Sequence, residues 1–237
     1  MIRLDDPEVV RREYADAERL AGRSAIYSRR SGPDPVEIAF AAVAEVRPRR
    51  VLEVGGGRGE FGARLTRELG VELVEIDQSE HMVELMRVRG LDARVGDVQA
   101  LPFRDGAFDV AVANWMLYHV PDLHRGVAEL ARVLQQGGRL VAITNGAGHL
   151  RELFALAGLE PLTGLHSFVA ENGEEVLRQS FARVERRDAP GEVLVDHAAA
   201  ARYLESVIVG ELTIEVEPFE GDLVVHAAST VFIAETA

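Results

Sequence analysis

Residues 51–59 read Val-Leu-Glu-Val-Gly-Gly-Gly-Arg-Gly, and this stretch decides the fold. Its apolar positions 51, 52 and 54 suit a strand that is buried on both faces of a parallel sheet. The glycines that follow allow a tight turn and let a ligand approach the backbone closely. A helix from Phe61 to Leu69, ended by Gly70, is predicted next. Strand, glycine loop and helix in this order indicate an α/β fold with a ligand at the loop.

A second strand, over residues 71–77, ends in an acidic residue. Ser79 is placed to cap a following helix over Glu80–Arg89. Asp77 therefore lies where the strand meets its loop, and its carboxylate can accept hydrogen bonds from both hydroxyls of a ribose. Alternation along the strand points Glu75 to the same side, so Glu75 stays an alternative for this role.

Residues 93–97 predict a third strand that ends in Asp97 and is followed by Val-Gln-Ala-Leu-Pro-Phe.

The glycines alone fit two kinds of cofactor. Gly57, Gly59 and Gly62 match the G-x-G-x-x-G pattern of dinucleotide-binding folds, so a nicotinamide cofactor is an alternative. However, all 26 basic residues are arginine, because the chain contains no lysine. This excludes the Tyr-x-x-x-Lys pair of a short-chain dehydrogenase, and it excludes Schiff-base chemistry.

In order and content, the segments over residues 50–144 resemble the S-adenosylmethionine-dependent methyltransferases of the Rossmann-like class I, type 11-like. Residues 106–114 resemble the fourth strand of this family, and residues 130–144 resemble the helix, glycine turn and fifth strand that follow it. The strand-end Asp97 separates this family from nicotinamide folds. The resemblance implies S-adenosyl-L-methionine as cofactor and S-adenosyl-L-homocysteine as product. It also implies an α/β three-layer sandwich around a seven-stranded, mostly parallel sheet of order 3-2-1-4-5-7-6, with an antiparallel strand 7, N-terminal helices and an inserted lid-like segment.

The resemblance further implies which residues hold the cofactor. The acidic residue and the glycine loop cradle its aminoacid part, Asp97 lies near the exocyclic amine of adenine, and the fourth strand runs beneath it. The implied cofactor-binding residues are Glu53, Gly55, Gly56, Gly57, Asp77, Gln78, Met82, Asp97, Val98 and Asn114. Gly56 fills a position where relatives commonly carry Ala, Cys, Ser or Thr.

A chain of 237 residues is long enough for one large α/β domain, and we expect a single methyltransferase domain. Its expected parts are N-terminal cap helices (1–47), a cofactor-binding core (48–145), a variable substrate or lid region (146–210) and a C-terminal strand (211–237). Helices are expected to start near Asp6 and Asp34. In the variable region and beyond we expect helices over 149–157 and 174–179, a segment at 165–170, a strand over 182–187, a helix capped by Asp196, and a last strand over 222–235.

The composition of the chain restricts the kinds of partner that the protein is expected to bind. A net charge of −13 argues against nucleic acid, whose binding depends on neutralising phosphates, so a small-molecule acceptor is preferred. The absence of cysteine excludes disulfides and thiolate metal sites, and no histidine and carboxylate spacing suggests a metal. With no signal peptide and no apolar run of about twenty residues, we expect no membrane partner and a cytoplasmic location. A homodimer is also a hypothesis.

Methyl transfer by in-line displacement requires positioning more than a catalytic residue. His119, just after the fourth strand, is a candidate general base, although a role in ordering its loop explains it equally well. Candidate substrate contacts are Tyr27, Arg30, Trp115, Tyr118 and His149, with His166 as a further histidine of the variable region. Two alternatives stay open: an RNA or protein methyltransferase, although the chain lacks the Asn/Asp-Pro-Pro-Tyr/Phe segment of amino-directed nucleic-acid methyltransferases, and a non-catalytic S-adenosylmethionine-binding protein.

Overall fold

The computed structural model describes residues 23, 25–161, 166–207 and 216–237. The helix expected near Asp6, residues 1–22 and 24 of the predicted N-terminal cap, and Leu165 lie outside the described residues. The strands are β1 (Arg50–Val54), β2 (Glu72–Asp77), β3 (Asp92–Val95), β4 (Phe108–Asn114), β5 (Leu134–Asn145), β6 (Arg183–Val195) and β7 (Leu223–Glu235).

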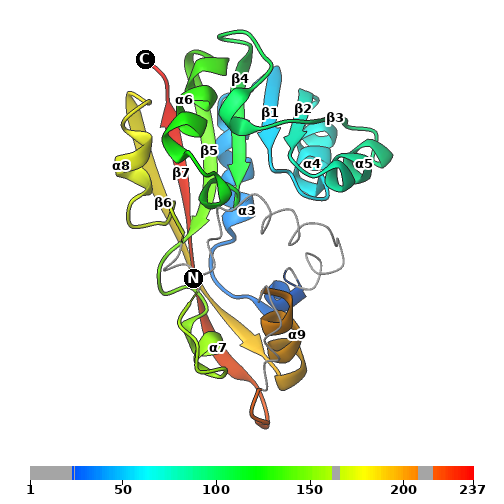
Figure 1. Ribbon diagram of the computed structural model, residues 1–237, viewed down its shortest axis with the longest axis vertical. Coiled ribbons are helices and arrows are strands. Elements are labelled where there is room, and N and C mark those ends of the chain that lie inside the picture. The colour runs from blue at the N-terminus through cyan, green and yellow to red at the C-terminus, as the bar shows by residue number, and fades with distance from the viewer. Residues whose placement is uncertain (1–22, 24, 162–165, 208–215) are drawn as a thin grey trace.

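These strands form one sheet of order β3-β2-β1-β4-β5-β7-β6, which confirms the predicted topology (Figure 1). Strands β1 to β5 run parallel, while β7 is antiparallel to both of its neighbours, β5 and β6. The sheet order reverses between β1 and β4. In open α/β sheets, ligands bind outside the carboxyl ends of the strands at such a reversal.

Helices cover both faces of the sheet. They are η1 (Ile26–Arg29), α3 (Pro35–Glu45), α4 (Glu60–Leu69), α5 (Glu80–Val88), η2 (Val98–Ala100), η3 (Leu117–His119), α6 (Leu123–Val133), α7 (Arg151–Ala155), α8 (Gly173–Leu177) and α9 (His197–Val207). Neighbouring β1 residues show the layering, because Val51 joins the core under α3 and α4 whereas Leu52 joins the core under α6 and α8. None of the described helices is long and apolar enough to span a bilayer.

The predicted helix starts are confirmed by their caps. The Asp34 side chain accepts a hydrogen bond from the Val36 N–H at 2.8 Å, and Ser79 accepts from the Met82 N–H at 3.3 Å. Asp196 likewise accepts from the Ala199 N–H at 2.8 Å. Each cap satisfies a backbone donor that the first helical turn cannot pair.

Strand β6 corrects the sequence-based expectation, which ended this strand at Arg187. It continues to Val195 and stays paired with β7 along its whole length. Pro190 does not end the strand, because β6 is an edge strand, where a proline without an N–H is tolerated.

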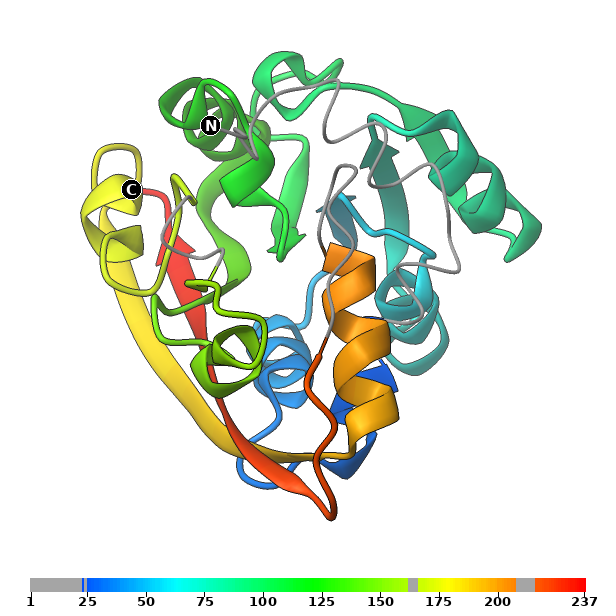
Figure 2. The ribbon, with the colours of Figure 1, turned by 60° about the horizontal axis from the view of Figure 1, so that its bottom comes forward.

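The extra length makes β6 and β7 a ribbon that projects beyond the sheet. β5 pairs with β7 only as far as Asn145 opposite Ser229, whereas β6 pairs with β7 on to Val195 opposite Leu223. The projecting ends therefore stand past the carboxyl end of β5. Helices η1, α7 and α9 pack on them in a small apolar core of their own (Figures 1 and 2). The ribbon thus builds a wall beside the carboxyl edge of the sheet.

Candidate active site

The glycine loop turns directly at the end of β1. Gly55, Gly57 and Gly59 adopt positive φ angles of 68°, 57° and 74°, which side chains rarely tolerate. The Gly55 N–H donates to the Ile76 carbonyl at 2.8 Å, and this bond ties the loop to the end of β2. The loop therefore presents backbone rather than side chains at the carboxyl edge of the sheet.

Asp77 ends β2 beside this loop. Its Oδ1 accepts a hydrogen bond from the Ser79 N–H at 2.8 Å, and the N–H groups of Gly57 and Gln78 also face the carboxylate. Burial raises the pKa of Asp77 to about 6, against the opposing effect of these donors. A half-buried carboxylate beside a glycine loop can accept further hydrogen bonds from a ligand hydroxyl pair.

Asp97 is held in place by Gln99. The Asp97 carboxylate accepts from the Gln99 backbone N–H at 2.8 Å and from its side-chain amide at 2.9 and 3.0 Å. The Gln99 amide oxygen in turn accepts from the Asp122 N–H at 2.9 Å. This chain of bonds fixes the loop after β3 to the loop before α6.

Asn114 and Trp115 lie at the end of β4. Asn114 Oδ1 is buried and receives no hydrogen bond from the described residues. Trp115 has a left-handed φ of 52°, and its Nε1–H donates to Asn145 Oδ1 at 3.0 Å. A buried acceptor without a donor and a strained residue next to it are features that concentrate at ligand sites.

Comparison with known proteins identifies the family. Residues 52–142 match the methyltransferase domain family. The chain is 31% identical to malonyl-[acyl-carrier protein] O-methyltransferase of Methylococcus capsulatus over 167 residues, which cover 65% of this chain and 60% of that protein. It is 30% identical to the ubiquinone/menaquinone biosynthesis C-methyltransferase UbiE of Pasteurella multocida over 170 residues, covering 67% and 55%.

Residues 52–142 form a methyltransferase domain of the class I S-adenosylmethionine-dependent type. The matched region spans a little more than half the length of these two curated relatives. The fold agrees, since the N-methyltransferase NodS of Bradyrhizobium japonicum, solved with S-adenosyl-L-homocysteine, superposes with a TM-score of 0.55 at 15% identity and 85% coverage of both chains.

The family's cofactor fits the residues present. The glycine loop brings backbone without side chains to this edge, Asp77 supplies a carboxylate, and Asn114 Oδ1 receives no hydrogen bond from the described residues. Three other predicted cofactor residues do not present a polar side chain within the site. Gln78 is exposed to solvent. The Met82 side chain is buried in the apolar core beneath α5, and the Val98 side chain is buried between β1, β4 and α6.

Glu53 does not reach the edge of the sheet as a free carboxylate. It is 2% exposed and faces Glu75, which is fully buried, beneath Gly56 and Gly62. The sequence placed Glu75 and Asp77 on the same side of β2, and that alternation is correct. The juxtaposition with Glu53 follows from the parallel β1–β2 register, which pairs these two residues.

Phenol and imidazole side chains line the side of the site next to the β6–β7 ribbon. The Tyr27 hydroxyl lies 2.8 Å from His149 Nε2, and His149 Nδ1 accepts from the Ala228 N–H at 3.0 Å. The Tyr27 hydroxyl also hydrogen-bonds with Tyr203 of α9. Burial lowers the pKa of His149 to about 4, so this imidazole is neutral near neutral pH.

A second aromatic group follows β4. The Tyr118 ring stacks on His166 at 4.1 Å with an interplanar angle of 6°, and it contacts the His119 ring edge-on at 4.5 Å. Burial lowers the pKa of His166 to about 3, and the charges of His119 and His149 act in the same direction. Tyr203 and the stacked His166 were not predicted as a unit, because sequence spacing gives no sign that they meet.

Arg30 has a structural role. Its guanidinium donates to the carbonyls of Pro33 and Ala189, the latter at 2.8 Å, and so binds the loop before α3 to β6. These bonds occupy the group that the sequence suggested for a substrate or cofactor carboxylate.

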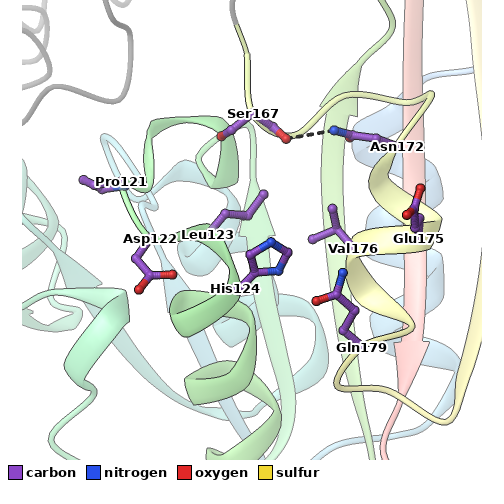
Figure 3. Close-up of a pocket in the computed structure, with 9 residues that line it drawn as sticks. All are labelled: Pro121, Asp122, Leu123, His124, Ser167, Asn172, Glu175, Val176 and Gln179. Atoms are coloured by element: carbon purple, nitrogen blue, oxygen red, sulfur yellow. Dashed lines mark hydrogen bonds between the residues drawn. The ribbon is translucent and has the colours of Figure 1, made fainter.

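The described residues also form an open pocket of about 530 Å³ between α6 and α8 (Figure 3). Its lining includes Asp122, His124, Glu175 and Gln179, and the Asn172 side-chain amide donates to the Ser167 carbonyl at its rim at 2.9 Å. It contains none of the predicted cofactor residues, so the strand-end geometry defines the active site instead. No three potential metal ligands cluster in the part of the chain that the structure describes.

Proposed function

We propose that this protein transfers a methyl group from S-adenosylmethionine to a small-molecule acceptor, at the carboxyl ends of β1, β2 and β4. The observation that carries the proposal is the convergence there of the glycine loop, the Asp77 carboxylate and Asn114 Oδ1, which has no hydrogen-bond partner among the described residues. When bound, the cofactor supplies a methyl group on a sulfonium. The chain's own residues then bind, orient and exclude water.

Each binding residue has a role that its chemistry suits. Asp77 would accept hydrogen bonds from the ribose hydroxyls, and the loop at Gly55 and Gly57 would face the aminoacid part. Asp97, held by Gln99, and the backbone after it would lie at the adenine. Asn114 would offer its buried side-chain oxygen to the cofactor or to the acceptor.

The wall beside this edge supports a small, uncharged acceptor group. Tyr27, His149 and Tyr203 form one hydrogen-bonded set, and Tyr118 and His166 form another, and the two histidines with lowered pKa values carry no charge near neutral pH. Phenols and neutral imidazoles can hydrogen-bond to a hydroxyl, carbonyl or amine and can pack against a ring. One of the two curated relatives is an O-methyltransferase and the other a C-methyltransferase, so the proposal covers oxygen and carbon as acceptor atoms.

Surface charge argues against RNA. Arg29, Arg50, Arg186 and Arg187 each pair with a carboxylate. Paired arginines on a chain of net charge −13 offer little attraction to a phosphate backbone. The homodimer and the general-base role of His119 stay predictions.

The first experiment is calorimetric titration of the purified protein with S-adenosylmethionine and, separately, with NAD. We expect binding of S-adenosylmethionine alone. Asp77→Asn should weaken it by about 10- to 100-fold, because it removes hydrogen bonds to a charged acceptor. Asp105→Asn, at a side chain that is 82% exposed and far from the site, is the matched control. Binding of NAD alone would overturn the assignment.

Turnover is then measured as S-adenosyl-L-homocysteine released with panels of phenols, carboxylic acids and amines. Release that depends on an acceptor and is lost in Asp77→Asn supports the proposed activity. Tight binding without release on any small-molecule panel, RNA or protein mixture would instead favour a non-catalytic binding protein. Release only with RNA or protein would reject the small-molecule acceptor.

A further inference from the structure

Two acidic side chains are buried together beneath the glycine loop. Glu53 on β1 and Glu75 on β2 are register partners, and they are 2% and 0% exposed. Glu53 Oε2 and both Glu75 carboxyl oxygens receive no hydrogen bond from any other described group. The two carboxyl groups lie close to each other across the strands, within reach of a shared proton. Two carboxylates cannot bond to each other unless one carries a proton.

Gly56 and Gly62 lie over the pair and leave the space that its carboxyl groups fill. A Cβ atom at Gly62 would overlap Glu75 Oε1 and come within 2.9 Å of Glu53 Oε2. A Cβ atom at Gly56 would overlap Glu75 Oε2 and lie 3.3 Å from Glu53 Cδ. The Glu75 carboxyl therefore fills the space directly under the loop and the first turn of α4, and this explains why position 56 has no side chain.

The surroundings decide which carboxyl keeps the proton. From β2, Asp77 adds a second negative charge near Glu75, and α4 and the loop contribute the Gly62 N–H, which bonds to Glu53. The described residues place no arginine or histidine against either carboxyl. Burial, together with the charges of Glu53 and Asp77, raises the pKa of Glu75 well above its usual range. Burial also raises the pKa of Glu53, to about 7, but the bonds from Glu75 and Gly62 oppose that rise.

We propose that Glu75 is a positioning residue for the cofactor loop: it stays a neutral acid, donates its proton to the Glu53 carboxylate, and so keeps one negative charge fixed beneath Gly55–Gly59. The inference rests on the proposed function, since that charge would face a cofactor with a sulfonium and an ammonium group. A pair that shares one proton behaves as a unit, as other close carboxyl pairs do.

The first test uses the protein without cofactor. Infrared difference spectra at about pH 8 should show the carbonyl stretch of a protonated carboxylic acid, which ordinary glutamates lose well below that pH. The band should vanish in Glu75→Gln and persist in Glu72→Gln, a matched change at an exposed residue of the same strand whose side chain is 78% exposed. Absence of the band in the unchanged protein would overturn the proposal, whatever the cofactor results.

The second test is the affinity for S-adenosylmethionine across the range from about pH 6 to about pH 9. Glu75→Gln retains a hydrogen-bond donor to Glu53 and removes the competing acid. Near pH 8 the affinity of this variant should therefore stay within about threefold of that of the unchanged protein. The acid limb, which is the fall in affinity at low pH, should move to lower pH. Glu75→Leu removes the donor, so affinity near neutral pH should fall about tenfold or more and the limb should move to higher pH. Comparing variants cancels the titration of the ligand itself.

A purely structural role predicts a different pattern, in which Gln and Leu weaken binding by the same factor at every pH and the limb does not move. That result would overturn the proposal. If Glu75→Leu fails to fold, Glu75→Gln and the infrared band still decide it. If no variant binds S-adenosylmethionine at any pH while the band is present, the proposed function fails but the shared proton stands.

Discussion

The Tyr27 hydroxyl and the His149 Nε2 lie 2.8 Å apart and join segments that are 122 residues apart in the chain. Because His149 Nδ1 accepts the Ala228 N–H, the ring proton is on Nε2 and donates to Tyr27. One buried imidazole thereby fixes η1, the start of α7 and the projecting end of β7 to one another. The wall of the proposed acceptor site depends on this bond.

Lowering the pH should destabilise the packing around His149. Burial lowers the pKa of His149 from 6.5 to about 4, so its stabilising contribution is complete above about pH 6.5 and is lost as pH falls towards 4. The contribution at stake is about 3 kcal/mol, because one pKa unit corresponds to about 1.4 kcal/mol. Urea unfolding of the unchanged protein and of His149→Gln should show a stability difference that shrinks between those pH values. His124→Gln, at an exposed histidine, should show no such change.

Tyr27→Phe tests the same bond from the other side. It leaves the buried Nε2–H of His149 without its acceptor, so we expect a loss of about 1–3 kcal/mol in the free energy of unfolding. Chemical denaturation monitored by circular dichroism measures it. Stability equal to that of the unchanged protein would show that the hydrogen bond is not made in solution.

Cofactor affinity should fall below about pH 6. The pKa of Asp77 is raised to about 6 by burial, and protonation removes the carboxylate that would accept hydrogen bonds from the ribose. Calorimetric titrations from about pH 5 to about pH 7 should show a limb near 6 that disappears in Asp77→Asn. A limb that persists unchanged in Asp77→Asn would assign it to another group.

Gly56→Ala should destabilise the protein by about 1–3 kcal/mol, because the new methyl group overlaps the Glu75 carboxyl. In a Glu75→Ala background, the same substitution should lower the free energy of unfolding by much less. A double-mutant cycle in thermal or chemical denaturation gives this coupling directly. Additive effects would contradict the packing of Glu75 beneath position 56.

Trp115 is the single tryptophan of the chain, and it follows Asn114 at the end of β4. Its indole N–H is bonded to Asn145 at 3.0 Å and its ring packs against the core under α3. We expect its fluorescence to change on titration with S-adenosylmethionine, and the signal to be absent in Trp115→Phe. Retained calorimetric binding in that variant is the control, while binding by the unchanged protein without a fluorescence change would contradict the placement of the cofactor beside β4.

The sequence by itself determined the first strands and their helices, the glycine loop and the strand-end acids Asp77 and Asp97, whereas the order of the sheet was implied by the family resemblance. These features depend on local rules: apolar runs form buried strands, glycines permit positive φ angles, and Asp34 and Ser79 cap the helices that follow them. Helix and strand bounds were correct to within a few residues wherever such signals were present.

Only the tertiary structure decided what meets across the fold. The length of β6 beyond Arg187 depends on its place at the sheet edge, where Pro190 costs no hydrogen bond. The pairing of Glu53 with Glu75 depends on the register of two parallel strands, and that of Tyr27 with His149 depends on a ribbon that brings distant segments together. Contacts between residues far apart in the chain are set by packing, which no local pattern records, so the burial that shifts their pKa values was equally beyond the sequence.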